Sequence, residues 1–370
     1  MRIMVLGLRG FPKIQGGVET HAEHLYPRLA VLGCDVEAIV RSPYWSEERP
    51  ETWRNIRFHC LWSPKTKGLE AMVHSLLGVL YAAVKRPDIL HIHAVGPAIV
   101  TPLARLLGLR VVVTHHGPDY EREKWGVIAR WVLCTGERLG MRFANRRIVI
   151  SDVIRRHILR RYGRDSDLIP NGVVVSEPPR STEALRRFSL EPGRYVLNVS
   201  RYVPEKRQLD LMRAFEDAAL PGWKLVLVGA VEPQDDYIRT VLEAAGRTPG
   251  VVVTGFQTGQ ALCELYAHAG LFVLPSSHEG LPIALLEALG NGLRVVASAI
   301  PANLEIGLPE EQYFQPGDIE ALAGMLRRIT AERPQDGVRE RVSAWVRERY
   351  DWDRIAGDTL DVYKRACEYP

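Results

Sequence analysis

Two carboxylates stand eight positions apart in the stretch HEGLPIALLEALG, residues 278–290. The apolar run LFVLP just before this stretch predicts a buried strand. The segment LPIALLEALGNG then predicts a helix with Pro282 in its first turn and glycines at its end. Glu279 is therefore expected just before the helix, and Glu287 about two turns into it.

The start of this predicted helix has the chemistry of an anion site. Backbone N–H groups at a helix N-terminus attract phosphate, so those of Gly280 and Leu281 are expected to face a phosphate group. Carboxylates instead accept hydrogen bonds from hydroxyls. A nucleotide sugar, with a diphosphate between a ribose and a hexose, fits both the anion site and the two carboxylates beside it. The alternative is that Glu279 supports the helix start and Glu287 lies on a solvated face. For Glu287 this is weaker, because its neighbours are apolar and an unpaired buried carboxylate is costly.

A pair of cations follows another predicted strand. In NVSRYVPEKRQLDLM, Arg201 and Lys206 flank a turn between the strand 195–200 and a helix expected over 207–217. An Arg fork and a Lys point charge together suit a diphosphate. They would stabilise the charge of a departing nucleoside diphosphate. The alternative interpretation is two ordinary surface cations.

A glycine-rich loop, GLRGFPKIQGGVET, comes directly after the first predicted strand. Gly16 and Gly17 allow a tight turn before a helix that starts near Val18, which predicts a second phosphate loop. The spacing is not GxGxxG, so a dehydrogenase is the least favoured class of enzyme.

Four histidines lie at or near two strand ends. His91 and His93 share one face of a strand, as a metal pair would, but no Asp, Glu or Cys completes a ligand set at a recognisable spacing. Core or cleft histidines are therefore the favoured interpretation, and no metal site is predicted. One of His115 and His116, at the end of the next strand, is better placed to bond a sugar hydroxyl.

Short β-branched runs alternate with helical patterns along the whole chain. Helices are expected over 18–32, 69–85, 97–107, 127–143 and the tail 318–367. The predicted strands are 2–7, 35–40, 56–61, 88–93, 110–116 and 147–151, then 195–200, 224–229, 251–256, 271–275 and 294–298. Their near-continuous apolar character is typical of parallel strands covered on both faces. The chain is therefore expected to be α/β, with two Rossmann-like doubly wound domains that face a cleft.

Charge and cysteine usage narrow the class further. Residues 1–180 carry ten more Lys and Arg than Asp and Glu, whereas residues 181–370 carry six fewer. A basic half suits anionic partners, and the alternative is a solvated surface. Five scattered cysteines without a CxxC pair favour a reduced, cytoplasmic protein. Neither a signal peptide nor a membrane span is expected.

Together, these stretches resemble the retaining family 4 glycosyltransferases of the GT-B fold, of the branch that builds bacterial surface polysaccharides. The family's Glu-x7-Glu motif matches Glu279 and Glu287, and its Arg-x4-Lys pair matches Arg201 and Lys206. Further matches are the Gly-Gly loop, a His-Gly at 116–117 and the linker-like IPNGV at 169–173. The family often has Gly before the Arg and after the Lys, where this chain has Ser200 and Arg207.

The resemblance implies a domain plan. An acceptor-binding domain would span 1–170, and a nucleotide-sugar-binding domain would span 171–349. A C-terminal helix over about 350–370 would pack back onto the first domain.

The resemblance also implies a role for each matching residue. Glu279, with Gly280 and Leu281, would hold the donor sugar, and Glu287 the ribose. Arg201 and Lys206 would hold the diphosphate. Gly16 and Gly17 would lie at the diphosphate, and His116 would contact the sugar. Phe256 and Gln257 would border the base.

The implied reaction is retaining sugar transfer from a nucleoside-diphosphate sugar to a glycan or polyprenyl-diphosphate-linked acceptor. The expected donor class is a UDP-sugar. No cofactor or metal is expected, because DSD at 165–167 lies in a loop before the linker. The acceptor would attack from the front face and the leaving phosphate would take the proton, with Asp119 as a conceivable helper.

The Arg-rich stretch 142–164 and the apolar helix 69–85 suggest peripheral docking on the inner face of an anionic membrane. Nucleic acid is not expected as a partner. Two other functions remain open: a nucleotide-sugar 2-epimerase of the same fold, whose acid–base carboxylates are not identifiable, and a non-catalytic nucleotide-sugar-binding subunit.

Overall fold

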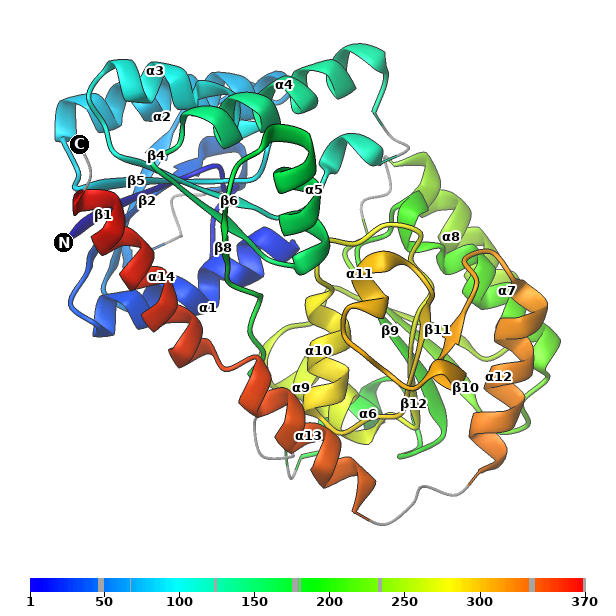
Figure 1. Ribbon diagram of the computed structural model, residues 1–370. Helices are drawn as coiled ribbons and strands as arrows, with labels where there is room; N and C mark the ends of the chain where they lie inside the picture. The colour runs from blue at the N-terminus through cyan, green and yellow to red at the C-terminus, as the bar shows by residue number, and fades with distance from the viewer. Residues whose placement is uncertain are drawn as a thin grey trace. The chain divides into compact units, whose positions relative to one another are not determined.

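The computed structural model describes residues 1–45, 50–66, 68–122, 125–174, 179, 181–231, 235–332 and 337–368. The chain forms two compact units: Met1–Gly172 together with Trp352–Pro370, and Val173–Asp351. Each unit is a parallel sheet between two layers of helices (Figure 1). The prediction of two doubly wound α/β sheets is therefore confirmed.

The sheet of the first unit has the strand order β3-β4-β2-β1-β5-β6-β7-β8. Its strands are β1 (Arg2–Leu6), β2 (Asp35–Arg41), β3 (Thr52–Trp53), β4 (Ile56–Leu61), β5 (Ile89–His93), β6 (Val111–His115), β7 (Arg146–Val149) and β8 (Asp167–Leu168). All pairs are parallel except β3 with β4. The six predicted strands are present with ends shifted by one or two residues. The two-residue strands β3 and β8 are too short to leave a periodic pattern.

The helices of the first unit cover both faces of its sheet. They are α1 (Gly17–Val31), α2 (Leu69–Lys85), α3 (Thr101–Leu106), α4 (Val127–Phe143), α5 (Asp152–Tyr162) and α14 (Trp352–Glu368), with short 3-10 helices η1 (Ser42–Tyr44), η2 (Pro97–Val100) and η3 (Asp119–Glu121). Helices α2, α3 and α4 lie on one face, and α1 and α14 on the other (Figure 1).

Helix α14 belongs to the first unit because its apolar side completes that unit's core. Trp352, Ile355 and Tyr363 are buried in one cluster with Tyr26 of α1. The chain passes the Trp352 ring at Gly172, where a Cβ would lie 2.5 Å from the indole. Only glycine fits there without displacing the ring.

The sheet of the second unit has the strand order β11-β10-β9-β12-β13-β14. Its strands are β9 (Tyr195–Val199), β10 (Lys224–Val228), β11 (Val251–Gly255), β12 (Leu271–Leu274), β13 (Val295–Ser298) and β14 (Tyr313–Phe314). Helices α7 (Gln208–Ala218), α8 (Asp236–Arg247) and α12 (Ile319–Ala331) pack together on one face. The remaining elements are α6 (Glu183–Arg187), η4 (Pro204–Lys206), α9 (Gly259–His268), α10 (Ile283–Gly290), α11 (Pro301–Leu304), η5 (Glu310–Gln312) and α13 (Val338–Arg349).

Three helix predictions need correction. The stretch 97–107 is not one helix: η2 leads into α3, and Pro97 and Pro102 stand at the start of each. The tail is not helical throughout, because α13 ends before Tyr350 and Asp351 forms an isolated β-bridge with Val173. Pro282 is not in the first turn of α10 but at its N-cap, with a non-helical ψ of 101°.

No helix among the described residues combines the length and the hydropathy that a membrane span needs. Helix α2, the most apolar candidate in the sequence, instead turns a stripe of apolar side chains to the surface of its unit: Leu69, Met72, Leu76, Leu80 and Val84 are all exposed.

Candidate active site

The loops after β9 and β12 bring a predicted cation and a predicted carboxylate together. These strands are parallel neighbours, so their carboxyl ends meet at one edge of the sheet. Lys206 Nζ donates a hydrogen bond to Glu279 Oε1, and the two side chains are only 16% and 9% exposed. Ser277 N–H also donates to the Glu205 carbonyl at 2.9 Å, which ties the two loops together. A ligand at this edge would meet a pre-formed ammonium–carboxylate pair.

The conformation of Arg207 accounts for one departure from the family pattern. Arg207 has φ 52° and ψ 38°, in the left-handed region where glycine is favoured. The glycine that the family often has here would take this conformation without strain. In this chain Arg207 takes it, and its guanidinium bonds Asp210 at 2.5 Å.

The loop that carries Arg201 is held by the first residue of α7. Gln208 Nε2 donates to the Arg201 carbonyl at 2.9 Å and to Ser200 Oγ at 2.8 Å, and its Oε1 accepts from Tyr237 at 3.0 Å. Gln208 is fully buried. The backbone at Arg201 is therefore fixed, as a site that positions a fork of N–H donors requires.

Glu287 lies one turn into α10, not two, because the helix begins at Ile283. Its Oε2 accepts a hydrogen bond from Tyr266 Oη of α9 at 2.8 Å. Burial raises the pKa of Glu287 to about 7, although the Tyr266 bond opposes the shift. The surroundings of Glu287 thus favour the protonated carboxyl group and its hydrogen bonding to a hydroxyl.

Replacing Glu287 with Gln is expected to stabilise the ligand-free protein at pH 8 by about 3 kcal/mol, but little below pH 4.5. The pKa of Glu287 is higher in the fold than in the unfolded chain. Its contribution to stability is therefore complete below the unfolded pKa and is lost as the pH rises through about 7. Urea unfolding at pH 4.5 and pH 8 measures the difference. The exposed Glu243→Gln is the control, and an equal effect at both pH values would contradict the prediction.

The other predicted donor-site residues of the second unit lie near α10 or at the sheet edge. Leu281 is buried, and Gly280 is half-buried beside it. Phe256 follows β11 and is 40% exposed, while Gln257 Nε2 donates to the Thr254 carbonyl at 2.7 Å. Strand β10 separates β11 from β9, so these two residues are not brought next to Lys206 and Glu279.

In the first unit, the glycine pair forms the start of α1. Gly16 is the N-cap with φ 157°, and a Cβ there would lie 1.9 Å from the Glu19 carboxylate. Glu19 Oε1 in turn accepts hydrogen bonds from the backbone N–H and the Nε of Arg9, at 3.3 and 3.2 Å. No described atom lies within 4 Å of a Cβ built on Gly17. The backbone at Gly17 therefore has open space in front of it.

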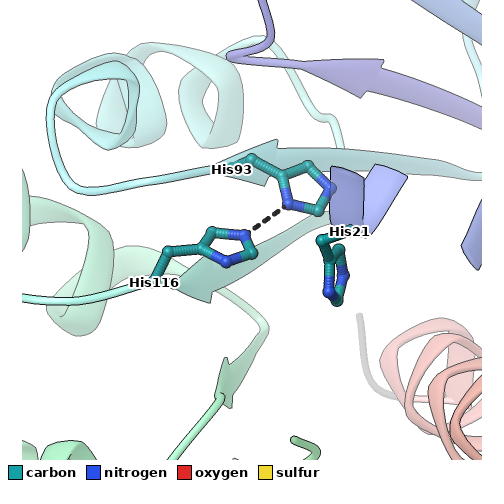
Figure 2. A group of neighbouring side chains, drawn as sticks. All are labelled: His21, His93 and His116. Carbon is teal, nitrogen blue, oxygen red and sulfur yellow. Dashed lines mark hydrogen bonds between the residues drawn. The ribbon is translucent and has the colours of Figure 1, made fainter. Parts of the chain in front are cut away.

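The structure distinguishes between the two adjacent histidines. His115 is fully buried, with Nε2 2.8 Å from Glu137 Oε1, and its Nδ1 accepts from Gly117 N–H at 3.1 Å. Both ring nitrogens are therefore occupied. His116 is half-buried, and its Nε2 lies 2.8 Å from His93 Nδ1 (Figure 2). Of the two, His116 is the less buried residue.

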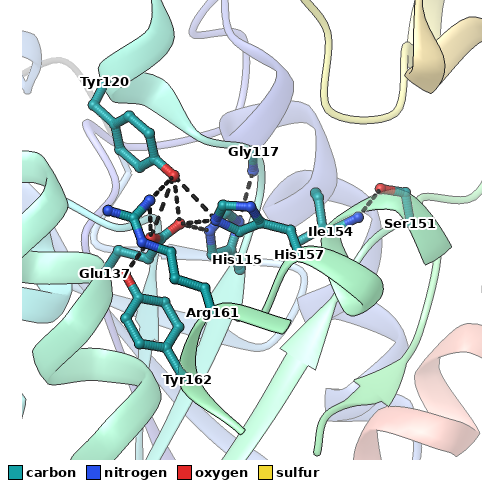
Figure 3. Close-up of polar contacts among 9 residues, drawn as sticks. All are labelled: His115, Gly117, Tyr120, Glu137, Ser151, Ile154, His157, Arg161 and Tyr162. Carbon is teal, nitrogen blue, oxygen red and sulfur yellow. Dashed lines mark hydrogen bonds and ion pairs between the residues drawn. The ribbon is translucent and has the colours of Figure 1, made fainter. Parts of the chain in front are cut away.

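Glu137 is the residue in this region that sequence reasoning missed (Figure 3). It is fully buried on α4, where no local pattern marks it. Its carboxylate accepts from Tyr120 at 3.2 Å and Tyr162 at 2.5 Å, besides His115. His157 and Arg161 approach it to 3.4 and 3.5 Å. Burial alone would raise the pKa of Glu137, but bonds from His115, His157 and Tyr162 hold it well below its usual range.

Three minor candidates have other partners. His91 bonds Tyr363 at 2.6 Å and Thr114 at 2.7 Å inside the core. Asp119 pairs with Arg122 at 2.7 Å. In the DSD stretch, Asp167 pairs with Arg365 of α14 at 2.7 Å.

Comparison with known proteins matches almost the whole chain. Residues 182–349 match the family described as Glycosyl transferases group 1, and residues 15–177 match Glycosyltransferase Family 4. The sulfoquinovosyl transferase SQD2 of Arabidopsis thaliana is 28% identical over 289 residues, which cover 72% of this chain. The chain spans only 54% of that relative's length.

Two solved structures are similar to the whole chain. Sucrose-phosphate synthase of Thermosynechococcus elongatus superimposes with a TM-score of 0.83 at 22% identity, covering 98% of both chains. Anabaena HepE, solved in complex with UDP and glucose, superimposes with a TM-score of 0.78 at 20% identity, covering 98% of this chain and 99% of that one. At these identities the likeness shows the fold.

Proposed function

Since this chain belongs to the group 1/family 4 glycosyltransferases and has their GT-B fold, we propose that it transfers a sugar from a nucleoside-diphosphate sugar with retention of the anomeric configuration. The family inferred from the sequence motifs is thereby confirmed, and its surface-polysaccharide branch stays a prediction. The proposed donor class is a UDP-sugar, and the proposed acceptor is a glycan or polyprenyl-diphosphate-linked sugar of a surface polysaccharide.

The observation that carries the proposal is the Lys206–Glu279 pair at the joined ends of β9 and β12. In the proposed complex, the donor diphosphate binds Lys206 and the Arg201 fork. Glu279 then accepts hydrogen bonds from sugar hydroxyls, and Glu287 from the ribose. Negative charge that builds up on the departing diphosphate meets a cation already in place, so little reorganisation is needed at the moment of transfer.

We assign the first unit to the acceptor and the second to the donor nucleotide. From the first unit, the Gly17 backbone would help to hold the diphosphate, and His116 would contact the donor sugar near its reacting carbon. The open space at Gly17 and the incomplete burial of His116 support these roles. No carboxylate nucleophile is proposed: the acceptor attacks from the front face, and the leaving phosphate oxygen takes its proton.

The experiment that tests the function measures the thermal midpoint with a panel of nucleotides and nucleotide sugars, first without metal and then with Mg²⁺. A ligand at 100 times its Kd stabilises by about 2.7 kcal/mol, which gives a measurable shift. A metal-independent shift with one nucleoside diphosphate and its sugars supports the donor class. No shift with any of them would contradict the proposal.

Product analysis with that donor separates the remaining functions. Transfer to an added glycan acceptor supports the transferase. Interconversion of the donor sugar without an acceptor would indicate the 2-epimerase. Binding without turnover across acceptors would indicate a non-catalytic subunit.

We also propose that the first unit docks on an anionic membrane that carries the acceptor. Helix α4 begins with three exposed apolar residues, Val127, Ile128 and Trp131, which are 84%, 80% and 68% exposed. A hollow of about 500 Å³ is lined by Trp131 and, among others, by Arg138, Arg142, Arg161 and Arg164. Apolar side chains that insert beside clustered guanidinium groups suit acyl chains and phosphate head groups together.

Replacing Val127, Ile128 and Trp131 together with Ser is expected to weaken binding to anionic vesicles at least tenfold. Each side chain loses apolar area that would be buried in the membrane, worth about 1.5–3 kcal/mol when burial is complete. Co-sedimentation with phosphatidylglycerol vesicles at low salt measures the change. The matched control is Leu304→Ser, which removes a 47% exposed leucine from the second unit. Failure of the parent protein to sediment would overturn the docking proposal.

A further inference from the structure

Three histidines from separate elements converge at the carboxyl edge of the first sheet (Figure 2). His21 lies on α1, His93 ends β5, and His116 follows β6. One ring nitrogen of each lies within 4.8 Å of the others. Strands β1, β5 and β6 are consecutive in the sheet, so the convergence follows from its topology.

The outer nitrogens of two of these rings are held by neighbouring polar groups. His21 Nδ1 lies 2.9 Å from Asn171 Oδ1, so the ring N–H donates to the amide oxygen and Nε2 keeps its lone pair. His93 Nε2 bonds the Tyr26 hydroxyl, which leaves Nδ1 facing His116. Outer-shell partners of this kind orient imidazole ligands in metal centres.

The three rings are in the protonation state that binds metal. Burial lowers the pKa of His21 to about 4 and the pKa values of His93 and His116 well below the usual range. Neutral imidazole is the ligand form. Within the cluster, a hydrogen bond joins His93 to His116.

The spacing of the nitrogens matches a tetrahedral ion after small movements. Zn–N bonds of about 2.0–2.1 Å with tetrahedral angles place ligand nitrogens about 3.3 Å apart. The His93–His116 nitrogens are 2.8 Å apart, and the third nitrogen is within 4.8 Å of both. A fourth ligand, such as water, would reach the ion beside His116, which is the half-buried residue of the three.

We propose that His21, His93 and His116 form a binding site for a late first-row divalent ion, with Zn²⁺ and Co²⁺ as its probes, and that the bound ion inhibits sugar transfer. Imidazole nitrogens suit such ions, whereas Mg²⁺ prefers oxygen ligands. Inhibition rests on the proposed function, in which His116 contacts the donor sugar. An ion held by His116 takes the ring away from that contact.

Titration of the full chain with Co²⁺ tests the site without any sugar donor. The expected result is one Co²⁺ per chain, with the visible absorption of tetrahedral Co²⁺, displaced by Zn²⁺ but not by Mg²⁺. His21→Phe is expected to abolish this signal and Asn171→Ala to weaken binding about 10–100-fold. The matched control His24→Asn, one turn further along α1 and outside the cluster, is expected to leave it unchanged.

Two results would overturn the site: no stoichiometric binding to the parent chain, or equal binding to the folded His21→Phe variant. Retained nucleotide-sugar stabilisation, which reports on the second unit, together with an unchanged circular dichroism spectrum identifies that variant as folded.

In the transfer assay, Zn²⁺ is expected to inhibit the parent and not His21→Phe, and a chelator to restore activity. A chain that binds Co²⁺ but transfers no sugar would overturn the proposed function and leave the metal site standing. Zn²⁺ that binds without inhibiting transfer would overturn the inhibitory role.

Discussion

Replacing Glu279 with Ala is expected to lower kcat/KM for sugar transfer by roughly 10²–10³-fold, a loss of about 2–4 kcal/mol of transition-state stabilisation. In the proposed complex Glu279 holds sugar hydroxyls and keeps the Lys206 ammonium in position, so its loss removes both an acceptor and an orienting partner. The free energy of unfolding is expected to fall by only about 1 kcal/mol, because each side chain keeps some contact with solvent. Initial rates at saturating and limiting donor, with urea unfolding of the same samples, measure both effects.

The matched control is Asp210→Ala. Asp210 also pairs with a cation of the same loop, Arg207, at 2.5 Å, but has no proposed contact with the donor. It is expected to keep kcat/KM within a few fold of the parent. Equal activity of Glu279→Ala and the parent would remove Glu279 from the donor site.

Replacing Glu137 with Ala is expected to destabilise the first unit by about 3–5 kcal/mol at pH 7, because it leaves several donors around a fully buried position, His115 and Tyr162 among them, without their acceptor. For a unit of this size, the thermal midpoint should fall by about 10 °C. The pH dependence follows from the low pKa of this carboxyl in the fold. Its contribution is present above the unfolded value of about 4.5 and is lost as the pH falls through the folded value.

Calorimetry of the parent and variant at pH 7 measures the loss, and acid unfolding measures the pH dependence. The control is Asp152→Ala on α5, a partly exposed carboxylate paired with Arg155 and Arg156, which should cost less than about 1 kcal/mol. A Glu137→Ala variant as stable as the control would show that the buried network contributes no net stability.

The two sheets could be predicted from the sequence because parallel strands covered on both faces are continuously apolar. That pattern marks runs such as β6 and β10 whatever surrounds them. It does not mark β3, β8 or β14, which are two residues long and form only where a longer strand offers its edge. Helix ends were less predictable: Pro282 is compatible with a first turn or an N-cap, and the loop before it decides which.

The residue types of the proposed donor site could also be recognised in the sequence, because cations and carboxylates that follow parallel strands gather at one sheet edge. The direct pairing of Lys206 with Glu279 could not be predicted, since it depends on β9 and β12 being neighbours although the two residues are 73 positions apart. The left-handed conformation of Arg207 could not be predicted either, because the sequence shows only that the glycine after the Lys of the family pattern is replaced.

The sequence by itself determined the fold class, the family and the chemical character of the proposed donor loops, since each depends on local pattern and spacing. Only the tertiary structure decided which histidine is fully buried against Glu137 and which is half-buried, because adjacent residues at a strand end point to opposite sides. It also decided that His21 joins His93 and His116, because three neighbouring strands bring together residues up to 95 positions apart.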